Sequence, residues 1–141
     1  MKKSVLISGI VGAVVLYLIN FLFYGMSGLM DSYAVNPETS AGRPDDQILH
    51  LHLALGHLVM GIFIAYIYRK WARGTHNFMH GIQFGALLGV AFGLGINLIW
   101  YATADYMTFT GHIIDSVWQI VSLGITGGVI SVITGKTDDD E

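Results

Sequence analysis

The stretch GIQFGALLGVAFGLGINLIWY, residues 81–101, decides the fold of this chain. It contains no charged residue, and it is long enough to cross a bilayer as a helix, which takes about 20 residues. Glycine recurs at every fourth position, at Gly81, Gly85, Gly89 and Gly93. Residues four apart lie on nearly the same helical face, and in lipid a glycine face lets another helix approach closely. The stretch is therefore predicted to be the central packing helix of a membrane bundle.

The composition agrees with a membrane protein. Of the 141 residues, 53% are hydrophobic and only 12% are charged, whereas charged residues make up about 25% of an average soluble domain. The net charge is -3 and no long basic patch occurs, so nucleic acid is not expected as a partner. The chain has no cysteine, which excludes disulfides, thiolate metal sites and cysteine catalysis. We expect residues 1–141 to form a single integral membrane domain in contact with the lipid bilayer.

Four apolar segments separated by polar connections predict an all-α, four-transmembrane-helix bundle. The spans are expected at about residues 5–26, 48–68, 78–101 and 112–133. Residues 27–47 contain proline, glycine and several acids and are predicted to form an outer loop, because proline and glycine interrupt helices. Residues 134–141 are predicted to form a solvated cytoplasmic tail.

The basic residues predict the orientation in the membrane. Arg43 alone falls on one side of the predicted spans, and the other side holds Lys2, Lys3, Arg69, Lys70, Arg73 and Lys136. Loops rich in lysine and arginine remain in the cytoplasm. A multi-pass protein with both termini cytoplasmic is therefore expected.

A short internal similarity suggests that the bundle is a tandem repeat. The first span ends INFLFY, residues 19–24, and the third ends INLIWY, residues 96–101. Both spans are predicted to run outward, so such a duplication would be a parallel repeat of two helical hairpins. A chance match in an apolar sequence is the alternative.

Polar residues gather in the predicted outer half of the spans. Because a polar side chain facing lipid is costly, these groups should face inward and meet. They predict a ligand-binding pocket lined by Asn20, Tyr24, His50, His57, Asn97, Tyr101, Asp115 and Gln119.

Several chemistries could use this pocket. His57, His112 and Asp115 are ligand types of a divalent metal, and His112 and Asp115 share a helical face, but no tight metal motif such as HExxH occurs. Histidines hydrogen-bonded to neighbouring helices, with no cofactor, are the simpler interpretation. A haem held by His57 and His112 is a further alternative. No nucleophile elbow or phosphate loop is present, so the sequence gives no support for an enzyme.

Several segments resemble a family of small four-helix bacterial membrane proteins of unknown function. The similar segments are Gly81 to Gly85, Asn97 with the aromatic residues after it, Ile113 to Asp115, Gly127 to Ile130, and Phe23 to Gly25. The resemblance covers about half of the chain and implies four spans in a bacterial inner membrane. It implies no activity.

Two functional hypotheses follow. The first is a non-enzymatic binding or accessory subunit whose glycine-rich face associates with a second copy, as a homo-oligomer, or with a larger membrane complex. The second is a small oligomeric transporter, or a metal or haem carrier, that uses the histidine, asparagine, aspartate and glutamine side chains of the outer half.

Overall fold

The computed structural model describes residues 2–35 and 43–139, which are almost entirely helical and contain no strand. Part of the predicted outer loop, residues 36–42, lies outside the described residues. Four segments are long and apolar enough to cross a membrane: Lys3–Met26, His50–Ala72, Phe78–Thr103 and Phe109–Asp138. The predicted all-helical chain with four membrane-length segments is confirmed to this extent.

Two of these segments contain a π-helical stretch. The first consists of α1 (Lys3–Asn20) followed by the π-helix η1 (Phe21–Met26). The third consists of α3 (Phe78–Leu88), the π-helix η4 (Gly89–Leu94) and α4 (Gly95–Thr103). The second and fourth are the continuous helices α2 (His50–Ala72) and α5 (Phe109–Asp139). Short 3₁₀ turns, η2 (Leu29–Tyr33) and η3 (Asp45–Gln47), lie between the first and second segments.

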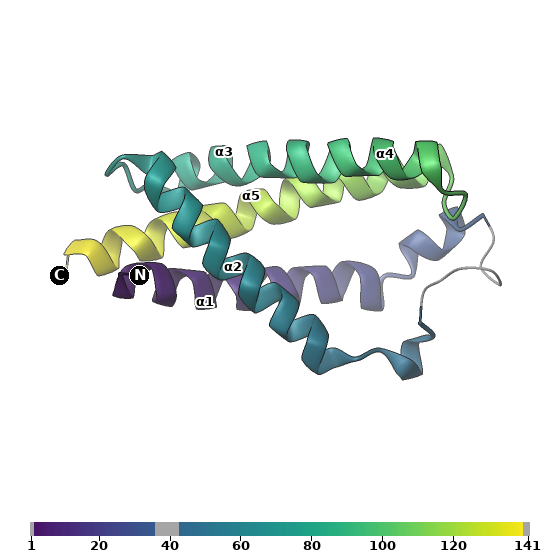
Figure 1. The fold of residues 1–141 in the computed structure, drawn as a ribbon, viewed down its shortest axis with the longest axis horizontal. Helices are drawn as coiled ribbons and strands as arrows, with labels where there is room; N and C mark the ends of the chain where they lie inside the picture. Colours follow the sequence, from purple (N-terminus) through teal and green to yellow (C-terminus); the bar gives the residue numbers. More distant parts are fainter. Residues whose placement is uncertain (1, 36–42, 140–141) are drawn as a thin grey trace.

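The helix α5 is the central helix of the bundle (Figure 1). It packs against α3 along one side and against α1 along the other, whereas α2 packs mainly on α1. Both chain termini and the turn between α2 and α3 lie at one end of the molecule, which we call the termini end. The remaining connections lie at the opposite, loop end, toward which α2 diverges from the other helices.

The glycine ladder packs against α5 within the same chain. A Cβ at Gly81 would overlap the backbone of Gly127, and one at Gly85 would overlap the carbonyl group of Leu123. At Gly89 the overlap would be with the backbone of Ile120. The four glycines therefore serve helix packing, as predicted. The expectation that this face docks a second protein is wrong, because α5 already fills the groove.

The π-helix explains how the ladder stays on one face. In an α-helix, a step of four residues overshoots a full turn by about 40°, so four such steps would carry Asn97 nearly to the face opposite Gly81. The wider turns of η4 rotate less per residue and offset this drift. As a result Gly93 still faces α5, where an added Cβ would lie 2.6 Å from the Cβ of Gln119, and Asn97 is 7% exposed.

The termini end is held by polar contacts between α2 and α5. The buried Tyr68 hydroxyl lies 2.6 Å from the Ser131 Oγ and donates to the Thr75 carbonyl oxygen at 3.0 Å. Arg69 donates to Asp138 at 2.5 Å, and both side chains are less than a quarter exposed. The acidic tail is therefore not simply solvated, because α5 remains helical to Asp139 and Asp138 is an ion-pair partner. Residues 140–141 lie outside the described part.

The two connections at the loop end are joined to each other. Val35 donates its backbone N–H to the Tyr106 carbonyl at 3.0 Å, and Thr108 donates to the Tyr33 carbonyl at 2.8 Å. These two hydrogen bonds flank an isolated antiparallel bridge between Ala34 and Met107. They fix the backbone on both sides of Tyr106, which lines the main cavity.

Candidate functional site

A carboxylate in the fourth segment is the centre of the main polar network. Asp115 Oδ1 accepts a hydrogen bond from the Tyr24 hydroxyl at 2.5 Å, and Oδ2 accepts from Asn97 Nδ2 at 2.6 Å. Three separate spans thus meet at this side chain. Both hydrogen bonds are short.

The network continues on both sides of Asp115. His112 Nδ1 lies 2.7 Å from Asn97 Oδ1, and because an amide oxygen can only accept, His112 is the donor. Asn97 Nδ2 also donates to the Gly93 carbonyl at 3.0 Å, so the amide is fully engaged. On the other side, Gln119 Nε2 donates to the Tyr24 hydroxyl at 3.1 Å. Each of these side chains therefore has a fixed orientation around the carboxylate.

No cationic side chain neutralises this carboxylate among the described residues. Arg69 and His76 pair with a different carboxylate, Asp138 at the termini end. The two donors to Asp115 are an uncharged hydroxyl and an uncharged amide. Charges placed within membrane spans are normally paired, or they mark the path or site of a ligand. An unpaired carboxylate is the feature that calls for a functional explanation.

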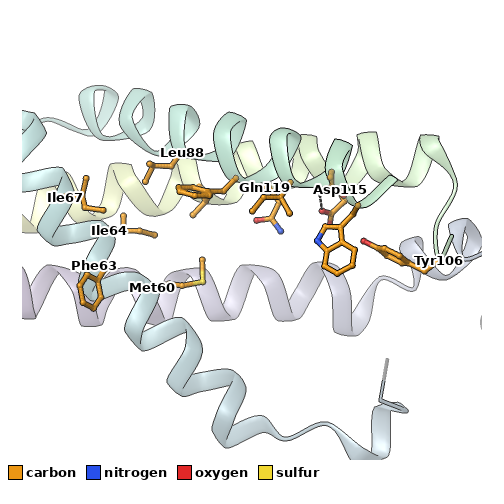
Figure 2. Close-up of a pocket in the computed structure, with 13 residues that line it drawn as sticks. Met60, Phe63, Ile64, Ile67, Leu88, Tyr106, Asp115 and Gln119 are labelled. Atoms are coloured by element: carbon orange, nitrogen blue, oxygen red, sulfur yellow. Dashed lines mark hydrogen bonds between the residues drawn. The ribbon is translucent and has the colours of Figure 1, made fainter. Parts of the chain in front are cut away.

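Asp115 lines a cavity of about 530 Å³ between α2 on one side and α3, η4, α4 and α5 on the other. This volume falls within the roughly 300–1,000 Å³ of ordinary ligand pockets. Figure 2 shows its long shape: Ile67 and Leu88 lie toward one end, and Asp115 and Tyr106 lie toward the other. We call it the central cavity, and it is lined by Met60, Phe63, Ile64, Ile67, Leu88, Phe92, Ile96, Asn97, Trp100, Tyr106, Asp115, Gln119 and Leu123.

The central cavity is amphipathic along its length. Asp115 and its partner Asn97 are at the end nearer the loops, Gln119 lies nearer the middle, and the rest of the wall is almost wholly aliphatic or aromatic. Met60 and Phe63 on α2 are 45% and 61% exposed. The apolar wall is therefore accessible from a surface that lipid would cover.

Tyr106 lies at the polar end of the central cavity, in the connection between α4 and α5. Burial raises the pKa of its phenol, and the negative charge of Asp115 raises it further. Its ring meets that of His112 edge-on, with centroids 5.2 Å apart. This residue therefore closes the polar end as an uncharged aromatic group.

A second set of polar side chains joins α1 to α5 and α2. Asn20 Oδ1 accepts from Trp118 Nε1 at 3.0 Å, and Asn20 Nδ2 lies 3.4 Å from His57 Nε2. Asn20 and His57 line a separate cavity of about 360 Å³ between the first segment and α2, together with Tyr24 and His50. Most of the predicted pocket residues are therefore divided between two cavities: Asn97, Asp115 and Gln119 line the central cavity, and the residues from the first segment and α2 line the smaller one.

Two of the predicted residues take little part in either network. Tyr101 is 50% exposed and lines neither cavity, and its ring lies 5.7 Å from that of His112. His50 contributes only a wall of the smaller cavity. Tyr101 therefore does not take the role of Tyr24, and the tandem repeat remains a prediction.

The metal hypothesis is not supported by the geometry. His112 and Asp115 are both hydrogen-bonded to Asn97, whereas His57 faces the smaller cavity. Within residues 2–35 and 43–139, no three metal-ligating side chains form a cluster that could hold an ion. The predicted set of His57, His112 and Asp115 is therefore wrong as a joint site. The haem alternative with His57 and His112 stays a prediction.

Sequence reasoning missed several residues of both sites. Trp118 binds Asn20, and its ring stacks on Phe23 with centroids 4.2 Å apart. Trp100 and Tyr106 line the central cavity. Aromatic residues near span ends are typical of the membrane interface, and this general preference conceals which of them face inward.

Comparison of the chain with family models, with curated proteins and with solved structures gave no match.

Proposed function

We propose that this membrane protein is a non-enzymatic binding protein whose ligand is a cationic amphiphile, held in the central cavity. The observation that carries the proposal is Asp115, a carboxylate with two hydrogen-bond donors and no cationic partner among the described residues, at the polar end of an apolar cavity. A protonated amine would supply the missing positive charge. Its hydrocarbon chain would lie along the aliphatic wall.

The chemistry of the polar end favours an amine over other head groups. A carboxylate or phosphate head would be repelled by Asp115, and a charge left unpaired at this depth is costly. An ammonium group donates up to three hydrogen bonds, and the carboxylate and the Gln119 amide that line the cavity carry suitable oxygen acceptors. Hydrogen bonds to charged groups contribute about 1.5–3 kcal/mol each, which corresponds to a preference of roughly tenfold or more over an uncharged head.

Trp100 provides the readout, because it is the tryptophan that lines the central cavity. The experiment titrates the detergent-purified protein with dodecylamine brominated a few carbons from the amino group, because Trp100 lies beside Tyr106 at the polar end, and measures quenching of tryptophan fluorescence. The equally brominated alcohol and carboxylic acid serve as matched probes. We expect the amine to bind at least about tenfold more tightly than the alcohol, the acid to bind most weakly, and Trp100→Phe to remove most of the quenching.

Asp115→Asn tests the role of the charge. It keeps the size of the side chain, and we expect it to abolish the preference for the amine over the alcohol. Asp46→Asn is the matched control, because this exposed acid lies in the connection before α2 and does not line the central cavity. Equal affinity of the unaltered protein for amine and alcohol would refute the proposal.

The proposed location is a bacterial inner membrane with both termini cytoplasmic. In support, the basic residues of the described chain lie mostly at the termini end, beside the N-terminus, the C-terminal part of α2 and the end of α5. Assembly with a second copy or with a larger complex is a separate proposal. It has to use a surface other than the glycine face, which α5 covers.

A further inference from the structure

The smaller cavity results from how α1 and α2 cross. They approach most closely at Gly9 and Gly61, where a Cβ on Gly9 would lie 2.7 Å from the Ile62 Cα and one on Gly61 would lie 2.7 Å from the Ala13 Cβ. Beyond this crossing, α2 diverges toward the loop end (Figure 1). The divergence leaves a space between the two helices.

This space has a polar part and an apolar part. The polar part is the cavity of about 360 Å³ that contains Asn20 and His57. The apolar part is a groove of about 290 Å³ lined by residues such as Ile10, Leu55 and Leu58. Tyr17 lines both, so the two adjoin at this residue. We call the whole the hairpin cavity.

The polar groups of the hairpin cavity are uncharged and incompletely paired. His57 Nδ1 lies 2.8 Å from the Leu53 carbonyl and must donate to it, so Nε2 of the neutral ring carries a lone pair. Asn20 turns its oxygen to Trp118, because the indole N–H can only donate, and this leaves the amide N–H groups facing His57. The distance between Asn20 Nδ2 and His57 Nε2 is 3.4 Å, longer than the usual 2.7–3.2 Å.

A hydroxyl group complements this pair. It can accept from Asn20 Nδ2 and donate to His57 Nε2 at the same time, because a hydroxyl is both donor and acceptor. Apart from His50 and His57, no acidic or basic side chain, that is no aspartate, glutamate, lysine or arginine, is among the residues found to line the polar cavity or the apolar groove. A charged head group would therefore enter without a counter-charge, which is costly within a membrane span.

We propose that the hairpin cavity is a second ligand site, which takes a neutral long-chain alcohol. Its hydroxyl binds Asn20 and His57, and its chain lies in the apolar groove between α1 and α2. This site does not depend on the central cavity, since the two have different walls and opposite preferences for head-group charge.

The test is photo-crosslinking with hexadecanol that carries a diazirine in mid-chain, followed by mapping of the labelled peptides by mass spectrometry. Labels are expected in residues 10–25 and 48–58, and excess hexadecanol should compete whereas hexadecylamine should not. Labels spread evenly over all four spans, or equal competition by the amine, would overturn the proposal.

Two variants sharpen the test. His57→Leu should lower labelling about fivefold, which corresponds to one lost hydrogen bond. The control is His52→Leu, which should leave labelling unchanged because His52 is exposed on the same helix and lies outside the cavity. Asn20→Asp keeps the oxygen that faces Trp118 but adds a charge, so competition should shift from hexadecanol to hexadecylamine. Unchanged labelling in His57→Leu, or an unchanged preference in a folded Asn20→Asp, contradicts the assignment. Quenching of Trp100 by the brominated amine, measured in the same variants, reports whether the central cavity and hence the bundle is intact.

Discussion

Gly85→Ala is the most direct perturbation of the packing between α3 and α5. The added Cβ would overlap the Leu123 carbonyl group and would lie 3.0 Å from the Gly124 Cα. Both are backbone atoms, so no side chain can rotate away to relieve the overlap. The two helices would have to move apart by about 1 Å, and a gap of 0.5–1 Å already forfeits about a quarter to a half of the dispersion energy across an interface.

The magnitude follows from comparison with a second glycine. Inserting a methyl group into a well-packed site costs about 1–3 kcal/mol. Gly56 lies within α2, and a Cβ there would meet nothing within 4 Å. Gly56→Ala should therefore show only the helix-propensity gain, up to about 1 kcal/mol. Gly85→Ala shares that gain, so we expect the two variants to differ by the packing cost alone, about 1–3 kcal/mol in unfolding free energy.

The assay is unfolding by sodium dodecyl sulfate in mild-detergent micelles, followed by circular dichroism. Gly85→Ala should unfold at a lower mole fraction of the denaturing detergent than the unaltered protein, and Gly56→Ala should unfold at the same or a higher one. If both substitutions have the same effect, α3 does not pack on α5 through its glycines. The ladder would then be available for another partner, as the sequence first suggested.

Two further predictions concern the polar contacts. Asn97→Leu removes the amide that joins His112 to Asp115 and leaves buried groups unpaired, so it should lower the unfolding free energy by about 2–4 kcal/mol. The control is Tyr101→Phe, at a half-exposed ring, which should change the unfolding free energy by less than about 0.5 kcal/mol in the same detergent titration. Arg69→Gln breaks the partly buried ion pair at the termini end and should lower the unfolding free energy by about 1 kcal/mol. This loss should shrink at high salt, because salt screens the attraction between the two charges. An equal loss at every salt concentration would contradict an electrostatic origin.

The sequence by itself determined the existence of four membrane-length helices and the small-residue face of the third. Both are properties of a single segment, since hydropathy and four-residue spacing are local. It also identified Asn97, Asp115, Gln119 and Tyr24 as side chains that should avoid lipid. The structure brings these four into one network.

Only the tertiary structure decided which surfaces meet. A glycine face permits close approach but does not specify the partner, and here the partner is α5 of the same chain. The depth of a side chain can be read from its place in a span, but its direction around the helix axis depends on π-helical turns such as η4, which no motif signals. Position along a span likewise did not show that His57 and His112, which the sequence placed in one metal site, have different partners: His112 binds Asn97, and His57 lies beside Asn20 in the smaller cavity. The glycine-rich helix remains the packing element, and the position that it gives Asn97 orients the carboxylate of Asp115.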